Sequence, residues 1–143
     1  MESIILNISN KTSDGIDAKN ILLVDDEDCT IFSLNSLLMS QGYNVTIARN
    51  MKKVVNFYKA NDKAIDLILM DISIPIIDGL EAIIELKQFD PDVPFLVMSS
   101  YSKESLGGVE EENYIRKPFK SYDLFKSIVN IFDVSVPASN VLQ

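Results

Sequence analysis

Histidine is absent from the 143-residue sequence, and cysteine occurs once, at Cys29. Without imidazole, the chain cannot use its own histidine as a general base, a zinc ligand or a phosphoryl carrier. A single cysteine excludes an intramolecular disulfide and a multi-cysteine metal site, and is typical of a reducing compartment. No apolar run reaches the ~18 residues of a membrane span, and the first residues lack a basic signal-peptide start. These absences predict a cytoplasmic protein without membrane insertion.

Basic residues are also scarce: 13 Lys and Arg stand against 21 Asp and Glu, which gives a net charge of -8. An acidic surface repels phosphate backbones and anionic lipid. The sequence has no basic stripe and no helix-turn-helix segment, so we expect no direct binding to nucleic acid. The length and the 47% of hydrophobic residues suit one folded domain.

Short, solidly apolar runs alternate with stretches in which apolar residues recur at helical spacing. Solid runs of this kind are typical of strands buried on both faces, and the spaced stretches are typical of amphipathic helices. This alternation predicts an α/β fold, a doubly wound five-stranded parallel sheet with helices on both faces. The expected strands are residues 20–24, 45–48, 65–70, 95–98 and 114–116, and the last helix lies near 121–131.

Chemically active side chains follow the strands at the edge of the sheet where such folds bind ligands. They are Asp25, Asp26, Asp71, Ser99 and Lys117. Three carboxylates in one place repel each other and require either protonation or a divalent cation, and Mg²⁺ suits a site with few protein ligands. A lysine and a hydroxyl beside the cation are what a phosphoryl group needs. The residues alone therefore predict a Mg²⁺-assisted phosphoryl site with an aspartate as nucleophile.

Four segments, in order, resemble the receiver domain of two-component response regulators, whose fold is flavodoxin-like. They are LLVDDE at 22–27, LMDISIP at 69–75 with Asp78-Gly79, FLVMSS at 95–100 and YIRKPF at 114–119. The resemblance covers about residues 20–132 and implies a phosphoacceptor in two-component or phosphorelay signalling rather than an ordinary enzyme. Phosphotransfer and autodephosphorylation would then be slow and self-catalysed.

The resemblance also implies a role for each matching residue near the acceptor. Asp71 would accept a phosphoryl group from a phosphohistidine of a histidine kinase or histidine phosphotransfer protein. Mg²⁺ would be held by Asp26, by Asp25 through water, by Asp71 and by the backbone carbonyl of Ser73. Lys117 would bridge the phosphate and the acid.

A conformational switch is implied at the remaining positions. Ser99 would bind a phosphoryl oxygen, Tyr114 would turn inward behind it, and the Lys117–Pro118 bond is a candidate cis peptide. Such recruited contacts are what shift a two-state equilibrium. We further hypothesise that Tyr101, two positions beyond Ser99, shields the phosphoryl group from water.

One interval departs from the family pattern. Ser99 and Lys117 lie 18 positions apart, about one helical turn less than is usual in the family. Gly107-Gly108 come early, and acidic residues fill 110–112. Because glycines disfavour helix, we expect a fourth helix that is shortened, tilted or replaced by loop, which places the Tyr114 switch in question.

Two other functions and several boundaries stay open at this point. Asp26 and Asp28, with Thr30, also fit the opening of a haloacid-dehalogenase-type aspartyl phosphatase, and an inert pseudo-receiver that only docks is the other alternative. We expect an N-terminal extension or linker at 1–19, which could be an edge strand or a loose arm. The receiver domain would span 20–132, with a tail at 133–143, and would be either free-standing or part of a hybrid histidine kinase. Its cognate kinase and downstream target are not evident from the sequence.

Overall fold

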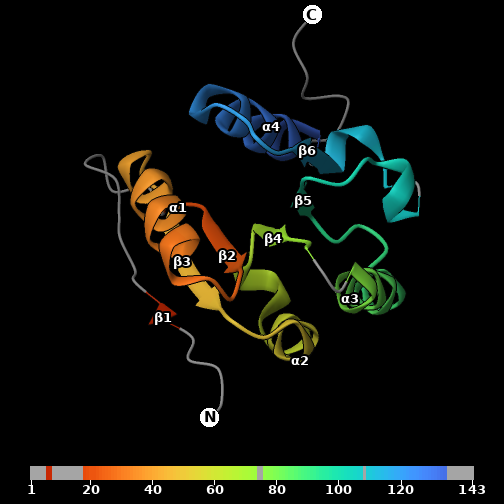
Figure 1. The fold of residues 1–143 in the computed structure, drawn as a ribbon. Coiled ribbons are helices and arrows are strands. Elements are labelled where there is room, and N and C mark those ends of the chain that lie inside the picture. Colours follow the sequence, from red (N-terminus) through yellow and green to blue (C-terminus); the bar gives the residue numbers. More distant parts are fainter. Residues whose placement is uncertain (1–5, 8–17, 74–75, 108, 135–143) are drawn as a thin grey trace, which may run out of the picture.

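The fold is a single mixed sheet with helices on both faces (Figure 1). The computed structural model describes residues 6–7, 18–73, 76–107 and 109–134. Across the sheet the strands run in the order β1-β3-β2-β4-β5-β6. Their bounds are β1 Leu6–Asn7, β2 Asn20–Val24, β3 Asn44–Ala48, β4 Leu67–Asp71, β5 Phe95–Ser99 and β6 Tyr114–Arg116.

The five strands from β2 to β6 are parallel, as predicted. The sixth, β1, pairs antiparallel with β3, Leu6 opposite Ile47. Of the alternatives left open for the N-terminal extension, the structure therefore shows an edge strand at Leu6–Asn7. The rest of residues 1–17, and residues 135–143 of the expected tail, lie outside the described residues.

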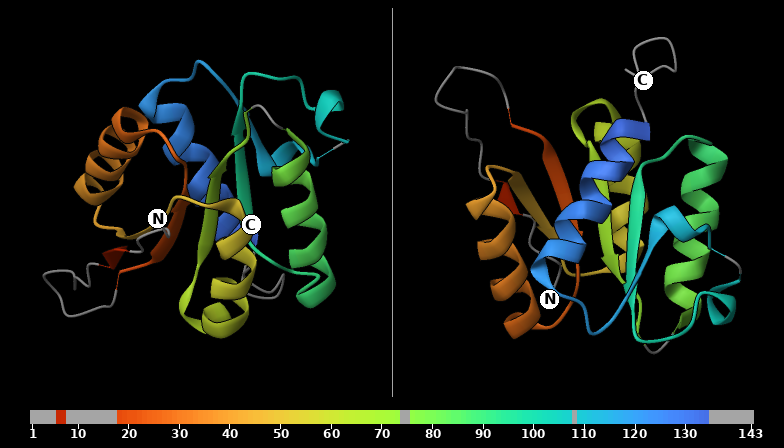
Figure 2. Two further views of the ribbon diagram at one scale, coloured as in Figure 1. Left: turned by 60° about the horizontal axis from the view of Figure 1, so that its bottom comes forward. Right: turned by 90° about the horizontal axis from the view of Figure 1, so that it is seen from above.

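The outer layers are formed by four α-helices in the described part of the chain, which is the doubly wound arrangement that the sequence predicts (Figure 2). They are α1 Asp28–Ser40, α2 Met51–Asn61, α3 Ile76–Phe89 and α4 Ser121–Val134. α1 and α4 pack on one face of the sheet with one buried cluster, and α2 and α3 pack on the other face with a second cluster. Because the sheet is covered on both faces, its central strands are apolar on both sides, which explains their unbroken hydrophobic runs.

Local signals account for where individual elements begin. The Asn50 side chain accepts a hydrogen bond from the Lys52 N–H at 2.8 Å and so caps α2. The strand expected at 65–70 begins two residues later, at Leu67. The reason is a preceding 3-10 turn, η1 (Asp62–Ala64), in which the Ile65 N–H bonds the Asp62 carbonyl.

The connection between β5 and β6 contains no α-helix in its described part. It holds two short 3-10 turns instead, η2 (Glu104–Leu106) and η3 (Glu111–Asn113). Gly107 ends η2 at a φ of 73°, a left-handed conformation that favours glycine. Leu106 is only 1% exposed and anchors η2 to the core. The prediction of an irregular fourth helical region is thereby confirmed.

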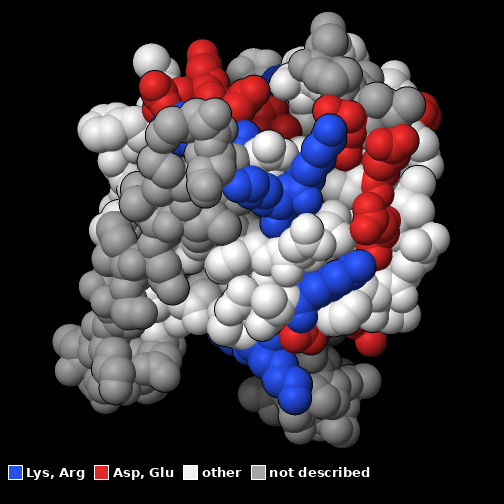
Figure 3. Space-filling model, turned by 90° about the horizontal axis from the view of Figure 1, so that it is seen from below, with Lys and Arg blue, Asp and Glu red and all other residues white. Residues whose placement is uncertain are grey.

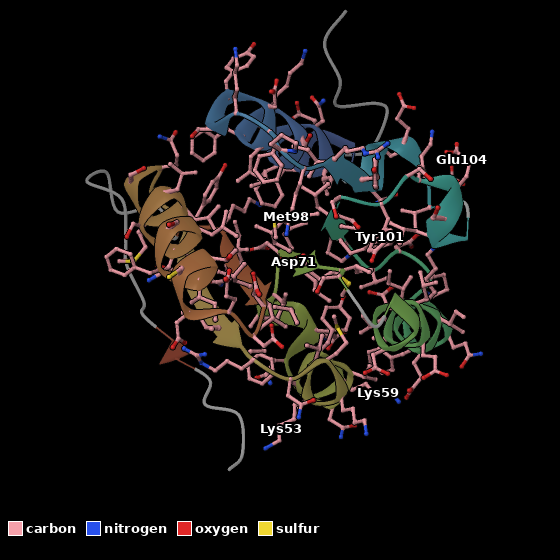
Figure 4. All side chains as sticks on the ribbon, in the orientation of Figure 1. Lys53, Lys59, Asp71, Met98, Tyr101 and Glu104 are labelled. Atoms are coloured by element: carbon pink, nitrogen blue, oxygen red, sulfur yellow. The ribbon has the colours of Figure 1, made fainter. Side chains whose placement is uncertain are left out.

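Charge is spread unevenly over the surface. Figure 3 shows a face on which Lys and Arg side chains lie within mainly uncharged surface, with Asp and Glu towards parts of its rim. On α2, Lys53 points outward from the molecule, whereas Lys59 lies toward α3, with its Nζ 3.9 Å from the Glu85 Oε2 (Figure 4). No helix in the described part of the chain is long and apolar enough to cross a membrane.

Candidate functional site

The site lies where β2 and β4 end side by side. Val24 is in register with Met70, so the next residues, Asp25 and Asp71, emerge at the same edge of the sheet. Asp71 is the last residue of β4 and lies near the middle of the row of strand ends (Figure 4). Parallel strands present their carboxyl ends at one edge, and ligands of this fold class bind there.

Asp71 is paired with Lys117. The Lys117 Nζ lies 2.6 Å from the Asp71 Oδ2, and the Asp71 side chain is 10% exposed. The lysine is held in place by its own backbone, because its N–H bonds the Ser99 carbonyl at the end of β5. A charge-assisted bond to a largely buried carboxylate is stronger than an exposed ion pair. The pair therefore fixes the lysine directly over the acid.

Asp25 is the second buried acid of the site. It is 7% exposed, and its Oδ1 accepts a hydrogen bond from the Glu27 N–H at 3.1 Å. Burial, and secondarily the neighbouring charge of Asp71, raises the pKa of Asp25 to about 6. Within the described residues, the Asp25 Oδ2 and the Asp71 Oδ1 are both buried without a hydrogen-bond partner. Two such oxygens side by side are costly unless something satisfies them.

A cleft of about 260 Å³ opens at these acids. The described residues contain no group of three His, Cys, Asp or Glu side chains arranged as a complete metal cage. Mg²⁺ does not need one, because it takes one or two carboxylates and keeps several waters. The two unpartnered oxygens fit that requirement. The cleft is lined by Val24, Asp25, Asp26, Arg49, Asn50, Met51, Asp71, Ile72, Ser73, Asp78 and Gly79.

The remaining residues predicted around the acceptor are placed as follows. Asp26 and Ser73 are exposed and line the cleft. Pro75 of the acceptor motif lies outside the described residues. The Lys117–Pro118 peptide bond is cis. The structure thus gathers the predicted acids and the lysine at one edge.

Ser99 and Tyr114 do not line the cleft. Ser99 is completely buried, and its Oγ accepts a hydrogen bond from the Tyr101 N–H at 3.1 Å. The Tyr114 hydroxyl donates to the Tyr101 carbonyl. The backbone of Tyr101 therefore joins the two expected switch residues, a link that the sequence did not reveal.

Arg49 is a lining residue that the sequence reasoning missed. It directly follows β3, and its Nη1 forms an ion pair with the Asp28 Oδ1 at 2.5 Å. A signal was present, because a basic residue directly after a buried strand lies at the same edge as the acids. It was overlooked because the second predicted strand carries no acid or hydroxyl at its end.

Comparisons with known proteins agree on one family. Residues 21–129 match the model of the response regulator receiver domain. The chain is 32% identical over 118 residues to the chemotaxis protein CheY of Halobacterium salinarum, covering 80% of this chain and 97% of that protein. It is 41% identical over 85 residues to the transcriptional regulatory protein ZraR of Klebsiella oxytoca, covering 58% of this chain but only 18% of that longer protein.

Solved structures give the same result. A crystal structure of the CheX–CheY–BeF3–Mg²⁺ complex of Borrelia burgdorferi contains a chain with a TM-score of 0.70 and 26% identity, over 83% of this chain and 92% of that one. Receiver domains of this family bind Mg²⁺ in the active site, act as phosphoacceptors rather than classical enzymes, and interact with histidine kinases and other signalling partners. This chain belongs to the response regulator receiver domain family of two-component signal transduction.

Proposed function

We propose that Asp71 is the phosphoacceptor and that it takes a phosphoryl group from a phosphohistidine on a partner kinase or phosphotransfer protein. The observation that carries the proposal is the contact of 2.6 Å between Lys117 Nζ and Asp71 Oδ2 beside the buried Asp25. Because these 143 residues contain no histidine, the donor imidazole must lie outside them. The proposed receiver unit spans residues 20–132.

The chemistry is a displacement at phosphorus. A carboxylate oxygen of Asp71 forms the new O–P bond, and the bond from phosphorus to the donor nitrogen breaks, with its electron pair leaving on the imidazole. With acetyl phosphate as donor, the leaving group is acetate. Lys117 then compensates charge on the transferred group.

Mg²⁺ fits beside the acceptor. Asp26, Asp71 and the Ser73 carbonyl would hold it, with Asp25 through water, and bound Mg²⁺ would neutralise negative charge on the phosphoryl oxygens. The two unpartnered carboxylate oxygens support this. The Borrelia burgdorferi complex, which contains BeF3 and Mg²⁺, also supports it.

The signal would leave the site through Ser99. If its hydroxyl turns to a phosphoryl oxygen, it loses the bond from the Tyr101 N–H. The Tyr101 carbonyl, which accepts from Tyr114, then shifts too. Two recruited contacts, from Ser99 and Lys117, give the modified state its differential free energy. Slow autodephosphorylation would return the protein to its unmodified state.

Intact-mass measurement tests the proposal. Wild type and Asp71→Asn are incubated with acetyl phosphate and Mg²⁺, and the fraction that gains one phosphoryl mass is followed with time. We expect the adduct in wild type only. Asp92→Asn is the matched control, because Asp92 is exposed and does not line the cleft; it should be phosphorylated as wild type is.

The outcomes separate the alternatives. Equal adduct in wild type and Asp71→Asn would identify another acceptor, and an adduct lost in Asp26→Asn but kept in Asp71→Asn would favour the phosphatase-type scheme. No adduct in any protein, together with no binding of Mg²⁺ or fluoroberyllate, would indicate an inert docking module.

A further inference from the structure

The cleft beside Asp71 is strongly acidic. Four aspartates line it: Asp25, Asp26, Asp71 and Asp78. Among the described residues that line it, Arg49 is the basic one, since Lys117 approaches Asp71 without contributing to the lining. A phosphodonor that carries about two negative charges near neutral pH is repelled by such a cleft. A cation in the wall is therefore placed where it would offset the repulsion.

Arg49 is held loosely enough to change partners. Its ion pair with Asp28 joins two exposed side chains, 40% exposed for Arg49 and 83% for Asp28. Ion pairs of this exposure contribute little free energy, because solvent screens them and both side chains lose freedom. Breaking this pair therefore costs little when a stronger anion arrives.

The guanidinium also has the right shape for that anion. Its planar fork of N–H donors matches two oxygens of a phosphoryl group, and such bonds are about twice as strong as neutral hydrogen bonds. Asp28 offers only a carboxylate at the outer surface. A phosphoryl group in the cleft would offer more negative charge in a less exposed place.

We propose that Arg49 exchanges Asp28 for the phosphoryl oxygens of the incoming phosphodonor, and so positions the donor for attack by Asp71. This rests on the proposed function of Asp71 and adds to it a binding residue directly after β3, besides the acids, the hydroxyl and the lysine already proposed. Arg49 forms and breaks no covalent bond. Asp28 acts as a competitor that occupies Arg49 until the donor arrives.

Initial rates of adduct formation test this, measured by intact mass across a range of acetyl phosphate concentrations at fixed Mg²⁺. We expect Arg49→Gln to raise the KM for acetyl phosphate about fivefold, the size of one exposed charge-assisted contact, with the rate at saturation unchanged. The KM of Arg49→Lys should lie between those of wild type and Arg49→Gln, because lysine keeps the positive charge but lacks the planar fork of N–H donors. If rates stay linear with donor concentration, the second-order rate constant should fall by the same factor and lose part of its salt dependence.

The pair itself gives the sharper test. Asp28→Asn should lower the KM about twofold, by freeing Arg49. In the Arg49→Gln background, the same Asp28→Asn change should have no further effect, because its action runs through the arginine. Lys52→Gln is the matched control: Lys52 is exposed on the first turn of α2 and does not line the cleft. It should leave the KM unchanged.

Two results would overturn the inference. One is a KM in Arg49→Gln equal to that of wild type or of Lys52→Gln. The other is an Asp28→Asn effect that persists without Arg49, which would indicate a general charge effect. Failure of the proposed function looks different, because the wild type itself would then form no adduct that depends on Asp71. Thermal unfolding of each variant shows whether it is folded before its rates are compared.

Discussion

At the ends of β2 and β4, two strands buried on both faces hold Asp25 and Asp71 in register. Between β5 and β6, by contrast, the described residues form only two three-residue 3-10 turns. The first region accepts the phosphoryl group, in our proposal, and the second would carry the response away from it. The ends of β2 and β4 are positioned by a ladder of backbone hydrogen bonds, and the connection between β5 and β6 by a few side-chain contacts.

The difference shows where each region is rigid. A ladder of hydrogen bonds fixes the acids to within the spacing of the strands. The second region depends instead on Leu106 in the core, on Gly107 in a left-handed conformation, and on the Tyr114 hydroxyl bonded to the Tyr101 carbonyl. The receiving end, that is, the ends of β2 and β4 with Asp25 and Asp71, should therefore tolerate few substitutions. The connection between β5 and β6 should tolerate substitutions at a modest cost in stability.

The largest expected effect is at Lys117. Lys117→Gln removes the cation that contacts Asp71, and loss of one preorganised donor at a reacting group typically costs about 10²-fold in rate. The initial rate of adduct formation from acetyl phosphate should fall by that order. Lys120→Gln, an exposed lysine three positions on, should keep the wild-type rate. A loss of less than threefold in Lys117→Gln would contradict the account of the receiving end.

The next effect is the pH dependence of the free energy of unfolding, which Asp25 sets. Its pKa of about 6 in the folded protein lies above the ordinary value of 3.8, so the folded state binds the proton more tightly than the unfolded state. The stabilisation is present below pH 4 and is lost as the pH rises through 6. Without Mg²⁺, the free energy of unfolding should fall by about 2 kcal/mol across this range.

Asp25→Asn should remove this slope of the free energy of unfolding against pH. It should also raise the free energy of unfolding at pH 7 in EDTA, as followed by urea unfolding. The exposed neighbour supplies the control: Asp26→Asn should keep the slope. A slope unchanged in Asp25→Asn would mean that burial of this acid is not what destabilises the site.

The backbone of the connection can be tested at Gly107, with Gly42, which lies between α1 and β3 and outside both regions, as the reference. Gly42 follows α1 at a φ of 86°, and Gly107 ends η2 at 73°, and neither has an atom within 4 Å of an added Cβ. Replacement by alanine then adds backbone strain alone, about 1 kcal/mol at each site. Urea unfolding should show equal losses. A loss near zero for Gly107→Ala alone would show that the connection rearranges freely, which would deepen the contrast between the regions.

The smallest expected effect concerns the lifetime of the phosphorylated state. Tyr101 is half-buried and packs against the core cluster on the α2–α3 face, and its backbone bonds Ser99 and Tyr114. If the ring shields the phosphoryl group from water, Tyr101→Ala should lose the adduct about threefold faster, a change of ~0.6 kcal/mol in the barrier. Tyr122→Ala, a 71% exposed tyrosine on α4, is the control. Slower loss in Tyr101→Ala would refute the shielding.

The parallel sheet, the helices on its two faces and the edge that collects the acids followed from the sequence, because solid apolar runs and the residues after them are local signals. The sequence also predicted the irregular connection, from Gly107-Gly108 and the short interval to Lys117. Arg49 and the Tyr101 link could not be predicted in the same way. The Arg49 pair depends on how the end of β3 meets the start of α1, and the Tyr114 bond spans 13 positions, so both are contacts that only the packed chain determines.

Chemical reduction of the phosphorylated protein locates the phosphoryl group itself. Wild-type protein treated with acetyl phosphate and Mg²⁺ is reduced with borohydride, which converts an aspartyl phosphate to homoserine, and its peptides are then sequenced by mass spectrometry. We expect homoserine at position 71 and unchanged aspartate at positions 25 and 26. Homoserine at position 26, with Asp71 intact, would contradict it.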